Sequence, residues 1–213
     1  MIPRLNTVEV RVLGCLLEKE KTTPEYYPLT PNALTNACNQ KSSRDPVMEL
    51  TQSLVIRAIF SLKDRGFVID KNEEGGRVTK YAHNFSKLMS ATNEERAVLC
   101  ILMLRGPQTA GEIKNRSERL ADFNSPAEVE SILQTLATRV DGPYTILLPR
   151  QTGQKERRYA HLFSGDPSEV KPALTDSETP KAANLPLEDR IANLEKRIDA
   201  LEKILQKPKQ IHD

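Results

Sequence analysis

The sequence predicts a mainly α-helical chain with small β-hairpins, an α+β protein in which one folding unit is used twice. Two short stretches are nearly the same: Lys80-Tyr81-Ala82-His83-Asn84-Phe85 and Arg158-Tyr159-Ala160-His161-Leu162-Phe163. Ahead of each stretch, apolar residues match at helical spacing with one constant offset: Val55, Ile59 and Leu62 correspond to Val129, Leu133 and Leu136. The offset differs between blocks, which places insertions in the connecting loops, where a duplicated domain tolerates them. We therefore predict two tandem copies of one domain.

The first copy, residues 1–89, begins with an amphipathic helix, because Asn6 and Glu9 form a capping box ahead of apolar residues with helical period. Thr30-Pro31 marks the start of a short second helix. A third helix over about 51–65 ends at Gly66. Apolar segments around 67–69 and 78–82, separated by glycines, predict a β-hairpin. Helix, helix, helix, hairpin is the order of a winged helix-turn-helix domain.

The second copy, residues 90–165, repeats this order. Thr92 and Glu95 form another capping box, and Thr109 caps a short helix. A third helix is expected over about 126–139. Strands at about 144–148 and 157–162 complete the hairpin, which is the longer of the two. The sequence thus predicts two tandem winged helix-turn-helix domains.

The last part of the chain differs in character. Residues 166–186 contain four prolines and no aromatic side chain, which predicts a flexible linker. Residues 187–206 form a heptad pattern, with apolar residues alternately four and three apart: Leu187, Ile191, Leu194, Ile198, Leu201 and Leu205. Isoleucine at a and leucine at d favour a two-stranded coiled coil, so we expect a homodimer.

Charges at the e and g positions support a parallel pairing of this C-terminal coiled-coil helix. Such a pairing places Arg190 opposite Glu195 and Arg197 opposite Glu202. The alternative is a lone amphipathic helix that docks on the protein's own body or frays, because fewer than three heptads are marginal in water.

Charge and composition bound the function. The 213 residues include 31 Lys+Arg against 29 Asp+Glu, and the pI is about 8.4. This is below the balance of a dedicated nucleic-acid domain, so any such binding must rest on local patches. Three isolated cysteines, Cys15, Cys38 and Cys100, are expected to be buried thiols in a reducing compartment. The longest apolar run has eight residues and no export signal is evident, so we expect a cytoplasmic protein without a membrane segment.

Two longer motifs indicate a family. The first is Thr22-Thr23-Pro24-Glu25-Tyr26-Tyr27-Pro28-Leu29, followed by Asn32-Ala33-Leu34-Thr35-Asn36-Ala37-Cys38-Asn39-Gln40-Lys41-Ser42 and Arg44-Asp45-Pro46-Val47. The second is Leu148-Pro149-Arg150-Gln151 with Arg158-Tyr159-Ala160-His161. Both resemble the YceH-like family of uncharacterised bacterial proteins, up to about Gly165. The resemblance implies two winged-helix domains in a cytoplasmic protein, and it carries over no catalytic or ligand residues.

The leading functional hypothesis is binding of double-stranded DNA. In a helix-turn-helix the third helix enters the major groove, and in the first copy its outward face carries Gln52, Arg57 and Lys63. Ile56 and Phe60 lie on the same face, which favours cover by protein over part of it. The third helix of the second copy begins with two glutamates, Glu128 and Glu130, so we do not expect it to bind DNA.

The two hairpins supply further candidate contacts with DNA phosphates. In the second hairpin four cations fall within nine residues: Arg150, Lys155, Arg157 and Arg158. Arg77 and Lys80 take the equivalent role in the first hairpin. The alternative is that these charges only keep the hairpins solvated.

The second helix and the loop after it form another candidate surface, through Asn36, Gln40, Lys41 and Arg44. Asparagine is also common at caps and turns for local reasons, and we favour such a structural use for Asn39 and Asp45. A loop of about ten residues is longer than a helix-turn-helix needs, which predicts a specialised contact or a dimer contact.

An enzyme is disfavoured, because the sequence has no cluster with metal-ligand spacing, no phosphate-binding glycine loop and no known nucleophile motif. No cofactor is expected. The recurring His83 and His161 are interpreted as packing residues of the duplicated unit. We expect a DNA-binding protein of the transcriptional-regulator type, acting as a dimer. The alternative is an adaptor that uses its winged helices to bind a protein partner without DNA.

Overall fold

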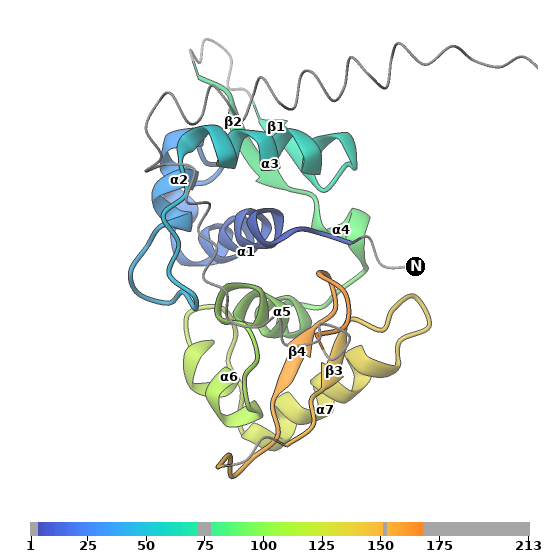
Figure 1. The fold of residues 1–213 in the computed structure, drawn as a ribbon. Coiled ribbons are helices and arrows are strands. Elements are labelled where there is room, and N and C mark those ends of the chain that lie inside the picture. Colours follow the sequence, from blue (N-terminus) through green and yellow to red (C-terminus); the bar gives the residue numbers. More distant parts are fainter. Residues whose placement is uncertain (1–3, 72–77, 151–152, 168–213) are drawn as a thin grey trace, which may run out of the picture. The chain divides into compact units, whose positions relative to one another are not determined.

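The computed structural model describes residues 4–71, 78–150 and 153–167. These residues form an α+β protein, as predicted (Figure 1). The helices are α1 (Thr7–Thr22), the 3-10 helix η1 (Pro24–Tyr26), α2 (Pro31–Cys38), α3 (Gln52–Asp64), α4 (Phe85–Leu88), α5 (Asn93–Arg105), α6 (Ala110–Arg116) and α7 (Pro126–Thr138). The strands are β1 (Val68–Lys71), β2 (Lys80–His83), β3 (Thr145–Leu147) and β4 (Tyr159–His161).

The element order of the first segment recurs in the second, so that α1, α2, α3, β1 and β2 correspond to α5, α6, α7, β3 and β4. Both hairpins are antiparallel, with Val68 opposite His83 and Thr145 opposite His161. The residue just before the cap of the second helix adds a bridge to each hairpin: Leu29 exchanges two backbone hydrogen bonds with Tyr81, and Gln108 exchanges two with Tyr159.

Both predicted capping boxes are present and each is extended by an arginine from the third helix. Glu9 closes the box with Asn6 and also pairs with Arg65. In the second segment Glu95 closes the box with Thr92 and pairs with Arg139 at 3.3 Å. The two arginines occupy the C-cap positions of α3 and α7, so the same ion pair ties the first helix to the third in both segments.

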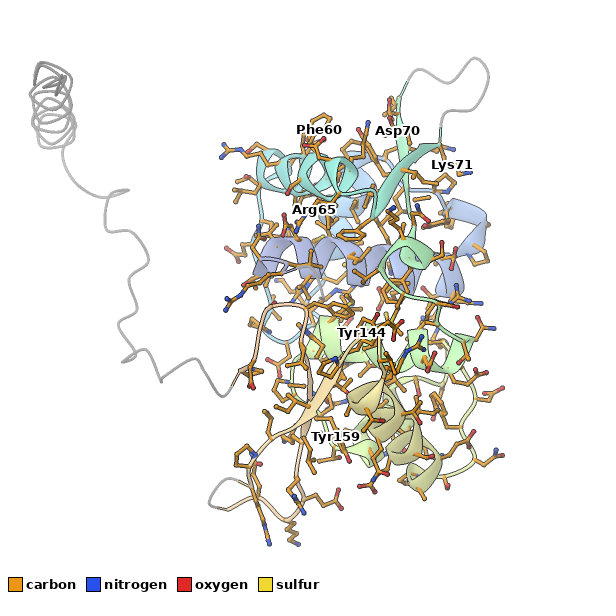
Figure 2. The ribbon with its side chains drawn as sticks, turned by 90° about the vertical axis from the view of Figure 1, so that its right-hand side faces the viewer. Phe60, Arg65, Asp70, Lys71, Tyr144 and Tyr159 are labelled. Carbon is orange, nitrogen blue, oxygen red and sulfur yellow. The ribbon has the colours of Figure 1, made fainter. Side chains whose placement is uncertain are left out.

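The equivalent helices α1 and α5 pack on each other in the middle of the protein. α3 lies on the far side of α1, and α7 on the far side of α5 (Figures 1 and 2). At the crossing, the Cys100 thiol lies 3.5 Å from the carbonyl oxygen of Gly14, which it can contact as a weak donor. A side chain on Gly14 would begin 3.0 Å from Leu104. Gly14 and Cys100 are equivalent positions in the two segments, so the segments are related by an approximate two-fold arrangement.

The hydrophobic core is continuous across both segments. The equivalent rings of Phe85 and Phe163 meet edge to face, with centroids 6.5 Å apart. Residues 4–167 therefore belong to one compact unit. The division into two domains, 1–89 and 90–165, stays a prediction, because it concerns whether each segment can fold on its own. The predicted linker 166–186, apart from its first two residues, and the coiled-coil helix 187–206 lie outside the described residues.

All three cysteines are buried and free, as expected. Burial raises the pKa of the Cys100 thiol well above its ordinary value. Among the described residues, none of the helices is both apolar and long enough to cross a membrane.

Candidate nucleic-acid interface

Helix α3 presents one face to the core and the other to solvent. Thr51 caps its first turn, and the buried face consists of Val55, Ala58, Ile59 and Leu62. Gln52 and Arg57 are exposed on the other face. Neither side chain makes a hydrogen bond or an ion pair with any residue that the structure describes, so both are available to a ligand.

The C-terminal half of the same face is different. Phe60 is 51% exposed, next to the half-buried Ile56. The Lys63 ammonium lies 5.9 Å from the centre of the Phe60 ring and 2.6 Å from the Asp70 carboxylate on β1. The Asp70 carboxylate raises the pKa of Lys63. Lys63 thus joins α3 to the hairpin, and a phosphate would have to compete with Asp70 for it.

In the first hairpin, Lys80 on β2 lies directly opposite Lys71 in the register of the sheet. Lys71 is exposed and Lys80 is half-buried. Arg77 lies outside the described residues. The hairpin therefore adds Lys71, which we did not single out from the sequence, to the candidate surface.

The candidates on α2 and in the α2–α3 loop divide into two groups. Asn36 and Lys41 are exposed. Arg44 is buried: it donates to both oxygens of Glu18 at 2.6 and 2.9 Å and to the carbonyl of Ala37 at 3.1 Å. Gln40 accepts a further hydrogen bond from Arg44. Burial alone would lower the pKa of Arg44, but Glu18 raises it above its ordinary value. Arg44 cannot reach a phosphate, and we correct its assignment to a structural one.

The length of the α2–α3 loop serves an internal contact. The backbone N–H of Asp45 donates to the carbonyl of Leu104 on α5, which docks the loop on the second segment. Asn39 makes two hydrogen bonds to the backbone of Leu50, a structural use as expected.

Arg11 is a structural residue that the sequence did not predict: it is buried and donates to the carbonyls of Cys38 and Pro46. The signal for it was an arginine within the apolar run of the first helix.

In the second hairpin, Arg158 turns inward. It donates to the carbonyl of Pro107, and its guanidinium lies 2.8 Å from the Glu112 carboxylate. Arg150, Lys155 and Arg157 are exposed, with Arg150 also donating to a backbone carbonyl within the hairpin. Three of the four predicted cations therefore remain at this tip.

Helix α7 carries its two glutamates where the sequence placed them. The Glu128 carboxylate accepts a hydrogen bond from the backbone N–H of Asn124, and the Glu128 backbone N–H donates to the hydroxyl of the capping residue, Ser125. Glu130 is exposed and accepts from the Tyr159 hydroxyl at 3.2 Å. Both carboxylates would repel a phosphate. Since α3 and α7 lie on opposite sides of the α1–α5 pair, they face away from each other (Figure 1).

The two equivalent histidines occupy different environments. His83 accepts from the N–H of Phe85, and its other nitrogen lies 3.1 Å from Glu20. His161 packs against Phe163, and burial lowers its pKa to about 4. Within the described ranges, no group of three or more potential ligand residues is close enough to hold a metal ion.

Comparison with known proteins gives a family match over most of the chain. The family model described as "Protein of unknown function, DUF480" matches residues 5–154. A UPF0502 protein of Geotalea uraniireducens is 51% identical over 197 residues, which cover 91% of this chain and 88% of the relative. A UPF0502 protein of Vibrio parahaemolyticus is 43% identical over 203 residues, covering 92% and 94%. One of Geobacter sulfurreducens is 48% identical over 200 residues, covering 92% and 90%.

Proposed function

The chain belongs to the family of bacterial proteins described as DUF480, and we propose that it binds double-stranded DNA through its first segment. Each segment is proposed to be a winged helix-turn-helix domain. In support, three helices are followed by a hairpin in both segments, and a bridge from the residue just before the cap of the second helix extends each hairpin. In such domains the third helix enters the major groove with its N-terminal residues at the base edges.

The observation that carries the proposal is the free N-terminal half of α3. Gln52 and Arg57 are exposed and, among the residues described, have no partner. Glutamine can bind an adenine edge and arginine a guanine edge or a phosphate. Asn36 and Lys41 in the preceding helix and loop are exposed as well, and the hairpin that follows α3 carries Lys71 opposite Lys80. α7 has carboxylates in the corresponding place, so the proposal assigns groove binding to α3 alone.

The tip of the second hairpin is proposed as a separate contact with the phosphate backbone, through Arg150, Lys155 and Arg157. The strands that carry this tip, β3 and β4, pack on α7 and α5, away from α3. It would therefore contact a different stretch of duplex. The predicted C-terminal coiled coil would pair two chains and supply a second α3 for a two-fold-related half-site.

Binding of random-sequence duplex DNA at several salt concentrations tests the proposal, with fluorescence anisotropy as the readout. We expect Arg57→Glu to weaken binding and to reduce the slope of log K against log salt by about 1, because one phosphate contact is lost. Lys87→Glu on α4 reverses an exposed charge elsewhere and serves as the control. The proposal fails if the wild-type chain shows no binding at about 50 mM salt, where phosphate contacts are strong.

A second candidate function, docking of a protein partner, is favoured by one observation. Phe60 is 51% exposed on the face that would meet DNA. Binding of a protein partner would be lost in the Phe60→Ala variant and retained in the Arg57→Glu variant. DNA binding through the N-terminal half of α3 predicts the opposite ranking, so the same two variants separate the two functions.

A further inference from the structure

A hollow of about 390 Å³ lies where the first segment meets the second, away from the exposed face of α3. Its walls come from the C-terminal halves of α1, α5 and α6, from the α2–α3 loop and from the start of the α6–α7 loop. Four cationic side chains line it, against two carboxylates: Lys19, Arg105, Arg116 and Arg119 against Glu18 and Glu118.

The carboxylates are too few to neutralise these cations. Glu18 lies 3.5 Å from Lys19 and is also engaged by both terminal nitrogens of Arg44, at 2.6 and 2.9 Å, so it is shared between two cations. Glu118 is exposed. Arg116 lies 3.9 Å from Glu112, whose carboxylate is already 2.8 Å from Arg158. The hollow therefore keeps an excess of positive charge.

Arg105 is the cation with the fewest internal contacts. Its guanidinium makes no hydrogen bond or ion pair with the residues that the structure describes, although the side chain is half-buried. Burial lowers the pKa of Arg105, and the positive charges of Arg116 and Arg44 lower it further, against a smaller opposing effect of the carboxylates of Glu18 and Asp45. A cation held beside other cations without a partner is destabilising unless an anion binds between them.

We propose that this hollow binds the phosphate group of a small molecule of about nucleotide size. Guanidinium groups bind phosphate oxygens by paired hydrogen bonds, and the hydroxyls of Ser42 and Ser43 in the same wall supply further donors. The volume falls in the range of small-molecule sites, and Ile101 and Leu120 add apolar wall for the rest of the ligand. Because both segments contribute to the walls, the ligand would hold them together. This site does not depend on DNA binding by α3.

Calorimetric titration of the full chain tests the proposal with four probes. These are a nucleoside 5′-monophosphate, the same nucleoside without phosphate, inorganic phosphate and sulfate. We expect the monophosphate to bind more tightly than inorganic phosphate, and the bare nucleoside not to bind. If none of the probes binds, the proposal is wrong. If sulfate and the monophosphate bind equally, the proposal is also wrong and the hollow is an adventitious ion site only.

Three variants locate the binding. Arg105→Gln should weaken binding of the monophosphate at least about tenfold, because a hydrogen bond to a charged group is lost. Glu118→Gln should tighten binding, since it removes a carboxylate that would repel the phosphate. Arg157→Gln, at the tip of the second hairpin, is the matched control and should bind as the wild type does.

The midpoint of thermal unfolding, measured without ligand, shows whether a variant has lost binding only because it is less stable. Arg105→Gln should leave this midpoint unchanged or raise it, because it removes like-charge repulsion. Should the variant instead lower the midpoint, Arg116→Gln provides the same test at a residue on the surface of α6. Undiminished binding by both variants would place the ligand elsewhere and overturn the assignment. DNA binding and its Arg57→Glu variant are measured separately, so failure of one proposal leaves the other intact.

Discussion

Arginine side chains have three separate uses in this protein. Arg11 and Arg44 are buried ties for the α2–α3 loop. Arg65 and Arg139 form ion pairs with the glutamates of the two capping boxes, and each guanidinium lies 5.8 Å from the centre of an aromatic ring. Arg57 is exposed on α3. The use depends on what surrounds each guanidinium, and a local sequence pattern does not distinguish a buried tie from an exposed contact.

His161 makes the stability of the protein sensitive to acid. In the unfolded chain a histidine has a pKa of about 6.5, whereas burial lowers the pKa of His161 to about 4 in the folded protein. Between these values the unfolded state binds a proton that the folded state does not. Stability is therefore fully present above the unfolded pKa and is lost as the pH falls towards 4, by at most about 1.4 kcal/mol per pH unit.

We expect His161→Leu to reduce this loss, measured as the urea midpoint at several pH values between neutrality and pH 4. His212→Leu changes a histidine beyond the described residues and is the control. An unchanged pH dependence in the His161→Leu variant would show that another group, such as His83, whose pKa is also lowered by burial, dominates the acid response.

At the scale of elements, the caps and the helix periods could be predicted because they depend on neighbours within a few residues. Both capping boxes, the start of α2 at Thr30-Pro31 and the pairing of the repeated Tyr-Ala-His strands agree with the sequence. The short helices η1 and α4 were not predicted. Neither has an apolar period long enough to be recognised.

The contact between α1 and α5 depends on the absence of a side chain at Gly14. A Cβ atom there would lie 3.0 Å from Leu104 Cδ2 and 3.1 Å from Met103 Cβ, which is closer than ordinary packing. Gly14→Ala gains about 1 kcal/mol of helix propensity, but overpacking of a tight contact costs about 1–3 kcal/mol. We expect a net loss in the free energy of unfolding, measured by urea titration.

Gly111 in α6 is the matched control, because its nearest neighbour to a new Cβ is Thr109 Oγ1 at 3.9 Å. Gly111→Ala should raise the free energy of unfolding by up to about 1 kcal/mol. Equal stabilisation by both substitutions would mean that α1 and α5 do not approach this closely in solution.

At the scale of the whole molecule, the shared core makes a prediction about folding. α1 is covered on one side by α3 and on the other by α5, and the core is continuous across both segments. A fragment of residues 1–89 would expose the face of α1 that α5 covers. We expect this fragment to unfold at a lower urea concentration than residues 1–167, which should unfold in one cooperative transition.

Circular dichroism of the two fragments checks this expectation. Equal midpoints for residues 1–89 and 1–167 would contradict it, and would instead support two independently folding domains divided at residue 89, as the sequence alone predicts.

Local spacing and directly comparable motifs were enough to predict the α+β class, the repeated order of elements, the caps and the family. Only the folded protein shows that the two repeats share one core, that Arg44 and Arg158 turn inward, and that Arg105 meets Arg116 in a common hollow. These features depend on contacts between residues far apart in the chain, such as Asp45 with Leu104 and Gly14 with Cys100. Local periodicity carries no information about which distant surface will cover a given side chain.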